Sequence, residues 1–237
     1  MRQIDSVVSE IKELYEKYNI DGFNIIDDNF TFDINYSKKI ILSIIKAGFK
    51  NVSFNSPNGI RVEYLDKELL NLMKEAGWRC IFIAPESGSV RTLKKMHKNI
   101  DLYMVKEKIK LIKDAGIKLF GFFMIGYPGE TVRDIKDTIR FACENDFDFS
   151  VFTCFQPIYG TPAYAELISS GELNRTPEGF DYYKVSYTPN DIGFNEIKFW
   201  RFWGLFRFYT SSFKRFRNIL SGYSLKRIFI FIFKIIS

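Results

Sequence analysis

The stretch GFFMIGYPGET, residues 121–131, joins an apolar run to the polar start of a helix. The run at 119–125 is short and apolar, which is typical of a strand buried in a parallel sheet. Thr131 and Asp134 have the spacing of a capping box, so a helix is expected to begin at Val132. The stretch therefore predicts a strand, a tight turn and a helix in immediate succession.

The capping box leaves the glycines of this stretch unexplained. Gly126 and Gly129 can adopt positive φ and let a ligand approach the backbone closely. Gly121 is expected to open the strand, where a missing side chain leaves room inside a barrel. The turn is therefore a candidate wall of a ligand site.

The same alternation of apolar strands and amphipathic helices runs along most of the chain. Strands are expected at 22–26, 51–54, 80–84, 119–125 and 149–155, with helices at 6–18, 36–46, 65–76, 90–96, 102–115 and 132–145 and a short one after 160–162. Strands alternating with helices predict an α/β fold with a parallel sheet, curved into a barrel or part of one. A doubly wound Rossmann sheet is the rival, but no G-x-G-x-x-G follows the first strand.

Charge divides the 237-residue chain unevenly. Its net charge is +6, yet residues 197–237 hold nine Lys/Arg and no acid, which leaves 25 basic and 28 acidic side chains in the rest. With 46% apolar residues the chain can bury a substantial core. We expect a barrel at 1–172, an ordered loop at 173–194 and a basic, aromatic, helical extension at 195–237.

The extension contains 13 aromatic residues among its nine cations. It could pack its aromatics on the barrel with the cations outward, lie on an anionic membrane surface, or contact nucleic acid, which is the least favoured of the three. A second segment, SLKRIFIFIFKIIS, ends the chain, and its apolar run at 228–236 is too short to span a bilayer. No signal peptide is visible, so a cytoplasmic location is expected, peripheral to a membrane if the extension binds lipid.

Polar or backbone-exposing residues follow every predicted strand. In parallel βα folds, ligands bind at the carboxyl ends of the strands. The five strand ends contribute Asp27, Asp28 and Asn29; Asn55, Ser56, Asn58 and Arg61; Glu86 and Ser87; Gly126, Gly129 and Glu130; and Gln156, Pro157 and Tyr159. Any one of these sets fits an ordinary polar loop, but the five together favour a binding rim.

Two of these strand ends allow alternative interpretations. Adjacent residues on a strand point to opposite faces, so Asp27 and Asp28 are not expected to converge on one ion. Asp28 or Asn29 could instead cap the following helix. Pro85 cannot continue a central ladder, so Glu86 is expected to face the site and accept from hydroxyls or an ammonium, unless it caps a helix.

Other catalytic chemistry has little support in the sequence. His97 is the only histidine and lies among basic residues at a helix end, where a surface position is expected. Cys80 and Cys154 fit core thiols and Cys143 a helix, so no metal site is predicted. A barrel lyase or aldolase would need a Schiff-base lysine or a metal cluster at a strand end, whereas Lys118 precedes its strand and no other lysine is well placed. No catalytic residue is identified.

Five segments, in this order and spacing, resemble the radical S-adenosylmethionine (SAM) enzymes: IIDDNFTFD, PNGIRVEYLDKELLNLMKEAGW, IAPESGSVRTLKKM, GFFMIGYPGET and FQPIYGTPAY. The resemblance covers residues 6 to 170 and is strongest to the branch that often carries a cobalamin-binding domain. It implies an incomplete TIM-like (β/α) barrel, containing family strands two to six, that binds SAM and a [4Fe-4S] cluster. Reductive cleavage of SAM would yield a 5′-deoxyadenosyl radical that abstracts a substrate hydrogen.

The resemblance also implies which residues contact SAM. Asp28 and Asn29 match the segment at the amino group, Arg61 would face a carboxylate, Glu86 and Ser87 match the ribose and methionine contacts, Ile125 and Gly126 the adenine contact, and Gln156 and Pro157 the segment that closes over adenine. All nine are expected to be cofactor-binding residues.

The family's CxxxCxxC cluster motif is absent from the chain. We therefore expect a fragment, a split gene or a degenerate homologue, inactive in isolation, with cobalamin bound only through a missing domain. The expected reaction is a radical-based transformation or methylation of an unknown small-molecule or lipid-like substrate. The alternative is a non-catalytic binding module whose extension contacts a membrane surface or a partner.

Overall fold

The computed structural model describes residues 2–173 and 181–222, with side chains up to residue 218. The chain packs into two compact units, each described by itself below. The first contains residues 1–84 and 103–120, and the second contains residues 85–102 and 121–237.

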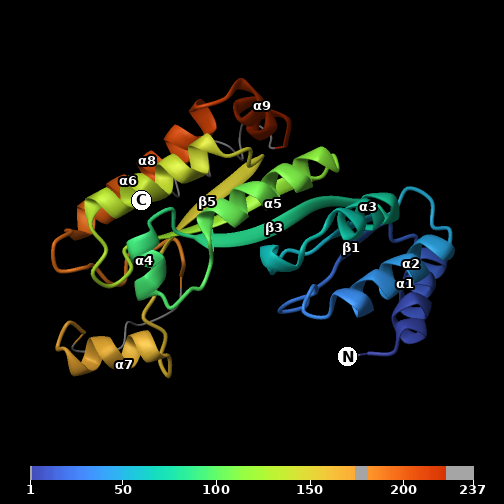
Figure 1. The fold of residues 1–237 in the computed structure, drawn as a ribbon, viewed down its shortest axis with the longest axis horizontal. Helices are drawn as coiled ribbons and strands as arrows, with labels where there is room; N and C mark the ends of the chain where they lie inside the picture. Colours follow the sequence, from blue (N-terminus) through green and yellow to red (C-terminus); the bar gives the residue numbers. More distant parts are fainter. Residues whose placement is uncertain (1, 174–180, 223–237) are drawn as a thin grey trace. The chain divides into compact units, whose positions relative to one another are not determined.

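Helices and strands alternate as the apolar pattern predicts (Figure 1). The elements are α1 (Ile4–Tyr18), β1 (Gly22–Asn24), α2 (Ile34–Lys46), β2 (Ser53–Asn55), the 3-10 turn η1 (Val62–Tyr64), α3 (Lys67–Ala76), β3 (Trp78–Glu86), α4 (Val90–Lys95), α5 (Leu102–Asp114), β4 (Lys118–Ile125), α6 (Val132–Glu144), β5 (Phe149–Cys154), α7 (Pro162–Ser169), α8 (Phe194–Thr210) and α9 (Phe213–Gly222). This order confirms the α/β prediction.

The five strands form one sheet in the order β1-β2-β3-β4-β5. Strand β1 pairs in parallel with β2, and β2 with β3, where the register shifts between Phe54 and Asn55. Parallel strands that are neighbours both in sequence and in space, each joined through helices, define an incomplete TIM-like (β/α) barrel. The predicted fold class is confirmed.

The predicted end of the third strand is wrong. Strand β3 runs through Pro85 to Glu86 instead of stopping at residue 84. Proline lacks the N–H that a ladder needs, but near the end of a strand the extended backbone can continue without that donor. The strand ends where Glu86 turns to φ 67°.

Aromatic stacking forms the core of the first unit. The Phe54 ring lies 5.5 Å from that of Phe23 and 4.9 Å from that of Trp78, with interplanar angles of 21° in both pairs. Helix α2 begins where Asp33 accepts hydrogen bonds of 3.0 Å from the backbone N–H groups of Asn35 and Tyr36. The alternative that Asp28 or Asn29 caps this helix is therefore wrong.

Phenylalanines also fill the core of the second unit, and they correct the interpretation of Gly121. The Phe123 ring stacks on Phe152 at 5.5 Å and meets the edge of Phe147 at 5.5 Å. Strand β4 begins at Lys118, so Gly121 lies inside the strand. A Cβ at Gly121 would lie 2.8 Å from the Phe147 ring, so that ring occupies the space expected to be open.

Helix α8 packs on β5 and α6 within the second unit (Figure 1). It buries Ile197 and Phe208, but it also buries Arg201 and leaves Phe199 and Trp203 exposed. The expectation that the aromatics pack inward and the cations outward therefore holds for only part of the helix.

Helix α9 is anchored by a buried cation. The Arg215 guanidinium donates to the carbonyls of Phe147, Cys143 and Asn145 at 3.0, 3.0 and 2.6 Å. The Cys143 carbonyl lies in the last turn of α6 and the other two lie just beyond its end, where a cation complements the helix dipole.

Some predicted segments lie outside the described residues. They are positions 174–180 of the expected ordered loop and positions 223–237, which include SLKRIFIFIFKIIS. Among the helices that are described, none is both long enough and apolar enough to cross a bilayer.

Candidate functional site

In the first unit, Thr31 brings two predicted site residues together. Its Oγ1 lies 3.2 Å from the Asn29 side-chain oxygen and 3.4 Å from the Arg61 carbonyl oxygen. The Asn29 backbone N–H donates to Asp27 at 2.8 Å, which closes a tight turn after β1 and leaves Asp28 exposed. Sequence reasoning missed Thr31, whose only signal is a hydroxyl close behind the strand-end residues.

The Arg61 guanidinium already has partners. Its Nη2 lies 3.0 Å from the Glu63 carboxylate, and the group sits 5.4 Å from the centre of the Tyr64 ring. About half of the side chain is exposed. A contact between Arg61 and a ligand carboxylate stays a prediction. The guanidinium would have to leave the Glu63 carboxylate for that of the ligand, or bind both at once.

In the second unit, Glu86 has an unusual backbone. Its φ of 67° lies in the left-handed region, which a residue with a long side chain adopts at a cost of about 1–3 kcal/mol. Such strain is concentrated at ligand sites. The carboxylate accepts a 3.0 Å hydrogen bond from Lys98, a residue with no sequence signal. Ser89, not Glu86, caps α4, so the capping alternative for Glu86 is wrong.

The Ser87 side chain is fully buried and bonded within the protein. Its Oγ lies 2.8 Å from the Thr138 hydroxyl and accepts a 3.0 Å hydrogen bond from the Ser89 backbone N–H. The contact with Thr138 ties the end of β3 to α6. A ligand role for Ser87 therefore stays a prediction, and it would have to use the backbone.

The turn after β4 uses positive φ at both glycines, as predicted: 84° at Gly126 and 66° at Gly129. The Ile125 carbonyl accepts from the Phe155 N–H at 2.9 Å. A Cβ at Gly126 would lie 3.3 Å from Ile197 of α8, so a protein side chain covers that side of the glycine. The adenine contact expected of Ile125 and Gly126 stays a prediction and would have to use another side of the backbone.

Glu130 holds this turn from inside, a role that sequence reasoning missed. Its Oε2 accepts from the backbone N–H groups of Gly126 at 2.6 Å and Tyr127 at 3.3 Å. Burial raises the pKa of this carboxyl to about 8, although the two N–H donors oppose the shift. Its Oε1 has no hydrogen-bond partner among the described residues.

Gln156 connects the end of β5 to the loop that precedes α8. Its Nε2 donates to the Lys184 carbonyl and its Oε1 accepts from the Ser186 hydroxyl, both at 2.7 Å. Pro157 beside it is buried. Glu86, Gly126 and Gln156 thus stand at the ends of three successive strands of one sheet, β3, β4 and β5.

The thiols of the chain do not fit an iron–sulfur cluster. Cys80 and Cys143 are half-buried and Cys154 is buried, and none of these three cysteines is in a disulfide. Cys80 was expected to be a core thiol, and this expectation holds only in part because the residue is half-buried. Burial raises the pKa of Cys154 to about 11, although Arg201 opposes the shift, and this disfavours the thiolate that binds metal. Among the described residues, no three His, Cys, Asp or Glu side chains are grouped to hold a metal ion. His97 is exposed, as predicted.

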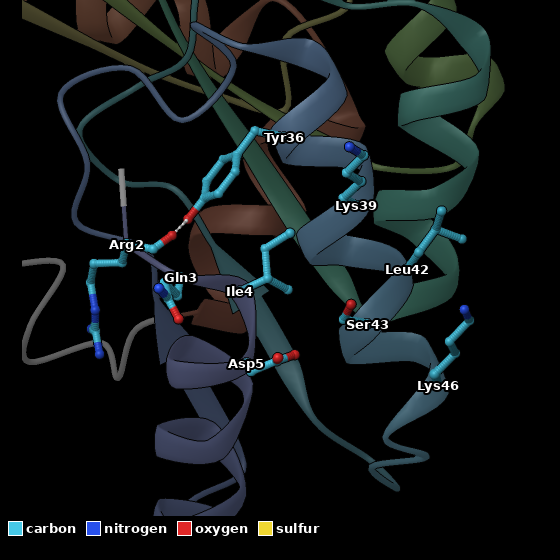
Figure 2. Close-up of a pocket in the computed structure, with 9 residues that line it drawn as sticks. All are labelled: Arg2, Gln3, Ile4, Asp5, Tyr36, Lys39, Leu42, Ser43 and Lys46. Atoms are coloured by element: carbon cyan, nitrogen blue, oxygen red, sulfur yellow. Dashed lines mark hydrogen bonds between the residues drawn. The ribbon is translucent and has the colours of Figure 1, made fainter.

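A separate pocket of about 530 Å³ lies in the first unit between the start of α1 and α2 (Figure 2). The Tyr36 hydroxyl donates to the Arg2 carbonyl at 2.6 Å across one end of it. Its lining consists of Arg2, Gln3, Ile4, Asp5, Tyr36, Lys39, Leu42, Ser43 and Lys46. None of the nine predicted site residues lines this pocket.

Comparison with known proteins defines the class to which this barrel belongs. The sequence model of the Radical SAM superfamily matches residues 1–142, and the chain belongs to that superfamily. The fold resembles that of the radical SAM methyltransferase TsrM from Kitasatospora setae, solved with cobalamin and a [4Fe-4S] cluster. The TM-score is 0.65 and the identity 17%, over 80% of this chain and 39% of TsrM.

Two sequence relatives are methyltransferases by name. The cytidylyl-2-hydroxyethylphosphonate methyltransferase of Streptomyces wedmorensis is 31% identical over 78% of this chain and 35% of its own length. An uncharacterized methyltransferase of Pyrococcus horikoshii is 29% identical over 72% of this chain and 36% of its own length. The chain thus spans only a little over a third of the length of these relatives.

Proposed function

We propose that this chain carries the SAM-binding barrel of a radical SAM methyltransferase, whose substrate is not identified. Membership of the superfamily and the methyltransferase relatives support the reaction class. The observation that carries SAM binding is the strained backbone of Glu86 at the carboxyl end of β3. Strained backbone of this kind clusters at active sites and ligand clamps.

Within the second unit, Glu86 is proposed to accept hydrogen bonds from hydroxyl or ammonium groups of SAM. Lys98 already donates a 3.0 Å hydrogen bond to this carboxylate, which shows that the group accepts from an ammonium. The backbone at Ile125 and Gly126 and the pair Gln156 and Pro157 are proposed to contact the adenine. The bonds from Gln156 to Lys184 and Ser186 support this role because they fix the Gln156 amide in place.

The first unit carries a separate part of the proposal. Asp28 and Asn29 are proposed to meet an ammonium group, and Arg61 a carboxylate. The exposure of Asp28 and the half-exposed guanidinium of Arg61 leave both charges accessible. The contribution of Asp28, Asn29 and Arg61 to SAM binding is to be tested with one single-residue variant for each.

In the superfamily, a bound cluster would supply the electron that cleaves SAM. The cysteines of this chain do not fit that cluster, so the proposal for its own residues ends at binding and orienting SAM. This observation also favours a second candidate, a SAM-binding module without catalysis of its own. Release of 5′-deoxyadenosine when the reduced chain is incubated with SAM would contradict the second candidate, which has no catalysis of its own.

Calorimetric titration with SAM and with S-adenosylhomocysteine tests the binding step. We expect saturable binding, and Glu86→Gln should weaken it roughly 10- to 100-fold because charge-assisted hydrogen bonds are lost. Glu75→Gln, an exposed glutamate on α3, is the control and should bind as the wild type does. Absence of saturable binding by the wild type, or equal affinity for Glu86→Gln, would contradict the proposal.

A further inference from the structure

A stripe of aromatic side chains lies exposed along α8. Phe199, Trp203 and Phe206 are 51%, 37% and 48% exposed. The Phe199 and Trp203 rings stack at 6.2 Å, Trp203 meets Phe206 at 5.7 Å, and Phe202 stacks on Phe206 at 6.1 Å. These four residues, spaced three or four apart, form one continuous strip that we call the aromatic stripe.

The aromatic stripe is not the face with which α8 packs on its own unit. The opposite side of the helix buries Ile197, Leu205 and Phe208. Gly204 also lies on that side, where an added Cβ would stand 3.2 Å from the Phe152 ring. A surface helix normally has one apolar face. Helix α8 has two, and the described part of the chain covers only one of them.

Cations lie beside the aromatic stripe at Trp203. A pocket of about 300 Å³ between α6 and α8 is lined by Lys136, Arg140 and Arg207 together with Trp200 and Trp203. The Lys136 ammonium lies 5.3 Å from the centre of the Trp200 ring, a cation–π contact, and in the described part of the chain no salt bridge involves Lys136. No ion pair within the described residues involves Arg207. The pocket can therefore receive an anionic group beside the stripe.

Negative charge is sparse on this side. Glu144 also lines the pocket, and Arg140 pairs with Asp137 at 3.0 Å. From residue 197 onward, however, the sequence contains nine Lys/Arg and no acid. The surface thus combines exposed aromatic rings with an excess of positive charge.

Helix α9 continues the same character. Phe213 is 81% exposed, and Phe216 is also exposed. Arg217 on this helix is exposed as well. Aromatic rings and cations side by side are the composition of helices that lie in the headgroup region of a membrane.

We propose that the aromatic stripe docks on an anionic phospholipid surface, with its rings at headgroup level and the cations of the pocket against lipid phosphates. Tryptophan and phenylalanine partition into this interface, and each nearby cation adds attraction to anionic lipid. The helix would lie on the bilayer, since no described helix is able to span one. The proposal concerns α8 and holds whether or not the barrel binds SAM.

Co-sedimentation of the full chain with vesicles tests the proposal. We expect binding to vesicles of equal parts phosphatidylcholine and phosphatidylglycerol, and little binding to phosphatidylcholine alone. The double variant Trp203→Ala with Phe206→Ala should bind at least about tenfold more weakly, because two interfacial rings are lost. Arg207→Gln should weaken binding roughly fivefold, and added salt should weaken it further.

Fluorescence identifies the residue that enters the interface. Trp203 emission should shift to the blue on binding, and Trp203→Phe should lose most of that shift while keeping most of the affinity. Tyr18→Ala, an exposed aromatic beside Lys17 on α1, is the matched control and should bind as the wild type does. Circular dichroism and the melting temperature should show that every variant folds.

Several outcomes would overturn the proposal. They are failure of the wild type to bind anionic vesicles, equal binding by the double variant, and equal binding to neutral vesicles. Dimerisation that the double variant abolishes would assign the stripe to a second copy instead. Preferential, stripe-dependent binding of RNA over the vesicles would assign it to nucleic acid.

Discussion

The backbone N–H of Gly126 donates a 2.6 Å hydrogen bond to the carboxyl group of Glu130, which is only 1% exposed. The bond closes the turn between β4 and α6 and supports the positive φ of Gly126. An acid thus stabilises, from the inside, a loop that carries predicted ligand contacts.

Glu130 should make stability depend on pH. Its pKa in the folded chain is about 8, raised by burial above the ordinary value near 4. The protonated form is the one that the fold favours, so this stabilisation is complete below about pH 4 and is lost as the pH rises to about 8. The maximum slope is about 1.4 kcal/mol per pH unit.

Glu130→Gln should remove this dependence. The amide keeps an acceptor oxygen for the Gly126 N–H and carries no charge at any pH. Urea denaturation should show the variant to be more stable than the wild type near pH 9 and similar to it near pH 5. Glu75→Gln on the exposed face of α3 should run parallel to the wild type. A constant difference between Glu130→Gln and wild type across this range would contradict the assignment.

Asp134 should make stability depend on pH in the opposite direction. Burial opposes its ionisation, but hydrogen bonds from Arg91, Ser89 and Thr131 outweigh that cost and lower its pKa. The Ser89 hydroxyl donates at 2.6 Å and the Thr131 N–H at 2.9 Å, which confirms the predicted capping box and adds a link to α4. This stabilisation is present above the unfolded pKa near 4 and is lost as the pH falls below it.

Asp134→Asn should therefore lower the free energy of unfolding by about 2–4 kcal/mol at neutral pH. The gap between variant and wild type should narrow as the pH is lowered from about 4. Asp137→Asn, on the same helix and paired with the exposed Arg140, should change stability by less than about 1 kcal/mol. Equal effects of the two substitutions would show that the buried network adds nothing.

A substitution at Gly121 tests whether the Phe147 and Phe123 rings fill the space that was expected to be open beside this glycine. Gly121→Ala would place a methyl group 2.8 Å from the Phe147 ring and 2.9 Å from the Phe123 ring, so both must move. A loss of about 1–3 kcal/mol in unfolding free energy is expected from overpacking. Gly22→Ala is the control because its Cβ would meet only the Ser53 hydroxyl at 3.5 Å. An unchanged melting temperature for Gly121→Ala would indicate that room for a methyl group remains beside β4 and that the packing inferred for these rings is wrong.

The elements that local sequence signals define were predictable. Helix α6 begins at Val132 as expected, because Thr131 and Asp134 lie three residues apart and need no tertiary information. The five strands were likewise predictable, because short apolar runs bounded by turns identify buried strands in an α/β fold. The end of β3 is the exception: the strand extends through Pro85, since the loss of one N–H donor near a strand end is tolerated.

The bonding of the candidate site residues was not predictable, because it joins residues far apart in sequence. Ser87 meets Thr138 across 51 positions, and Gln156 meets Lys184 across 28. Ile197 covers Gly126 because α8 packs on the rest of its own unit, 71 positions further along the chain. Periodicity and turn chemistry describe each segment alone and do not contain these pairings.

The three thiols lead to a final prediction about iron. Burial raises the pKa of Cys143 and, more strongly, that of Cys154, and no suitable group of ligands exists among the described residues. Anaerobic reconstitution of this chain with iron and sulfide should therefore yield, after desalting, no stable [4Fe-4S] absorption band and no stoichiometric iron. Mössbauer spectra should likewise lack the cluster signal. If a stoichiometric cluster did form, Cys→Ser substitutions at the three positions, made one at a time, would show which thiols hold it, and the conclusion that these cysteines do not fit a cluster would be wrong.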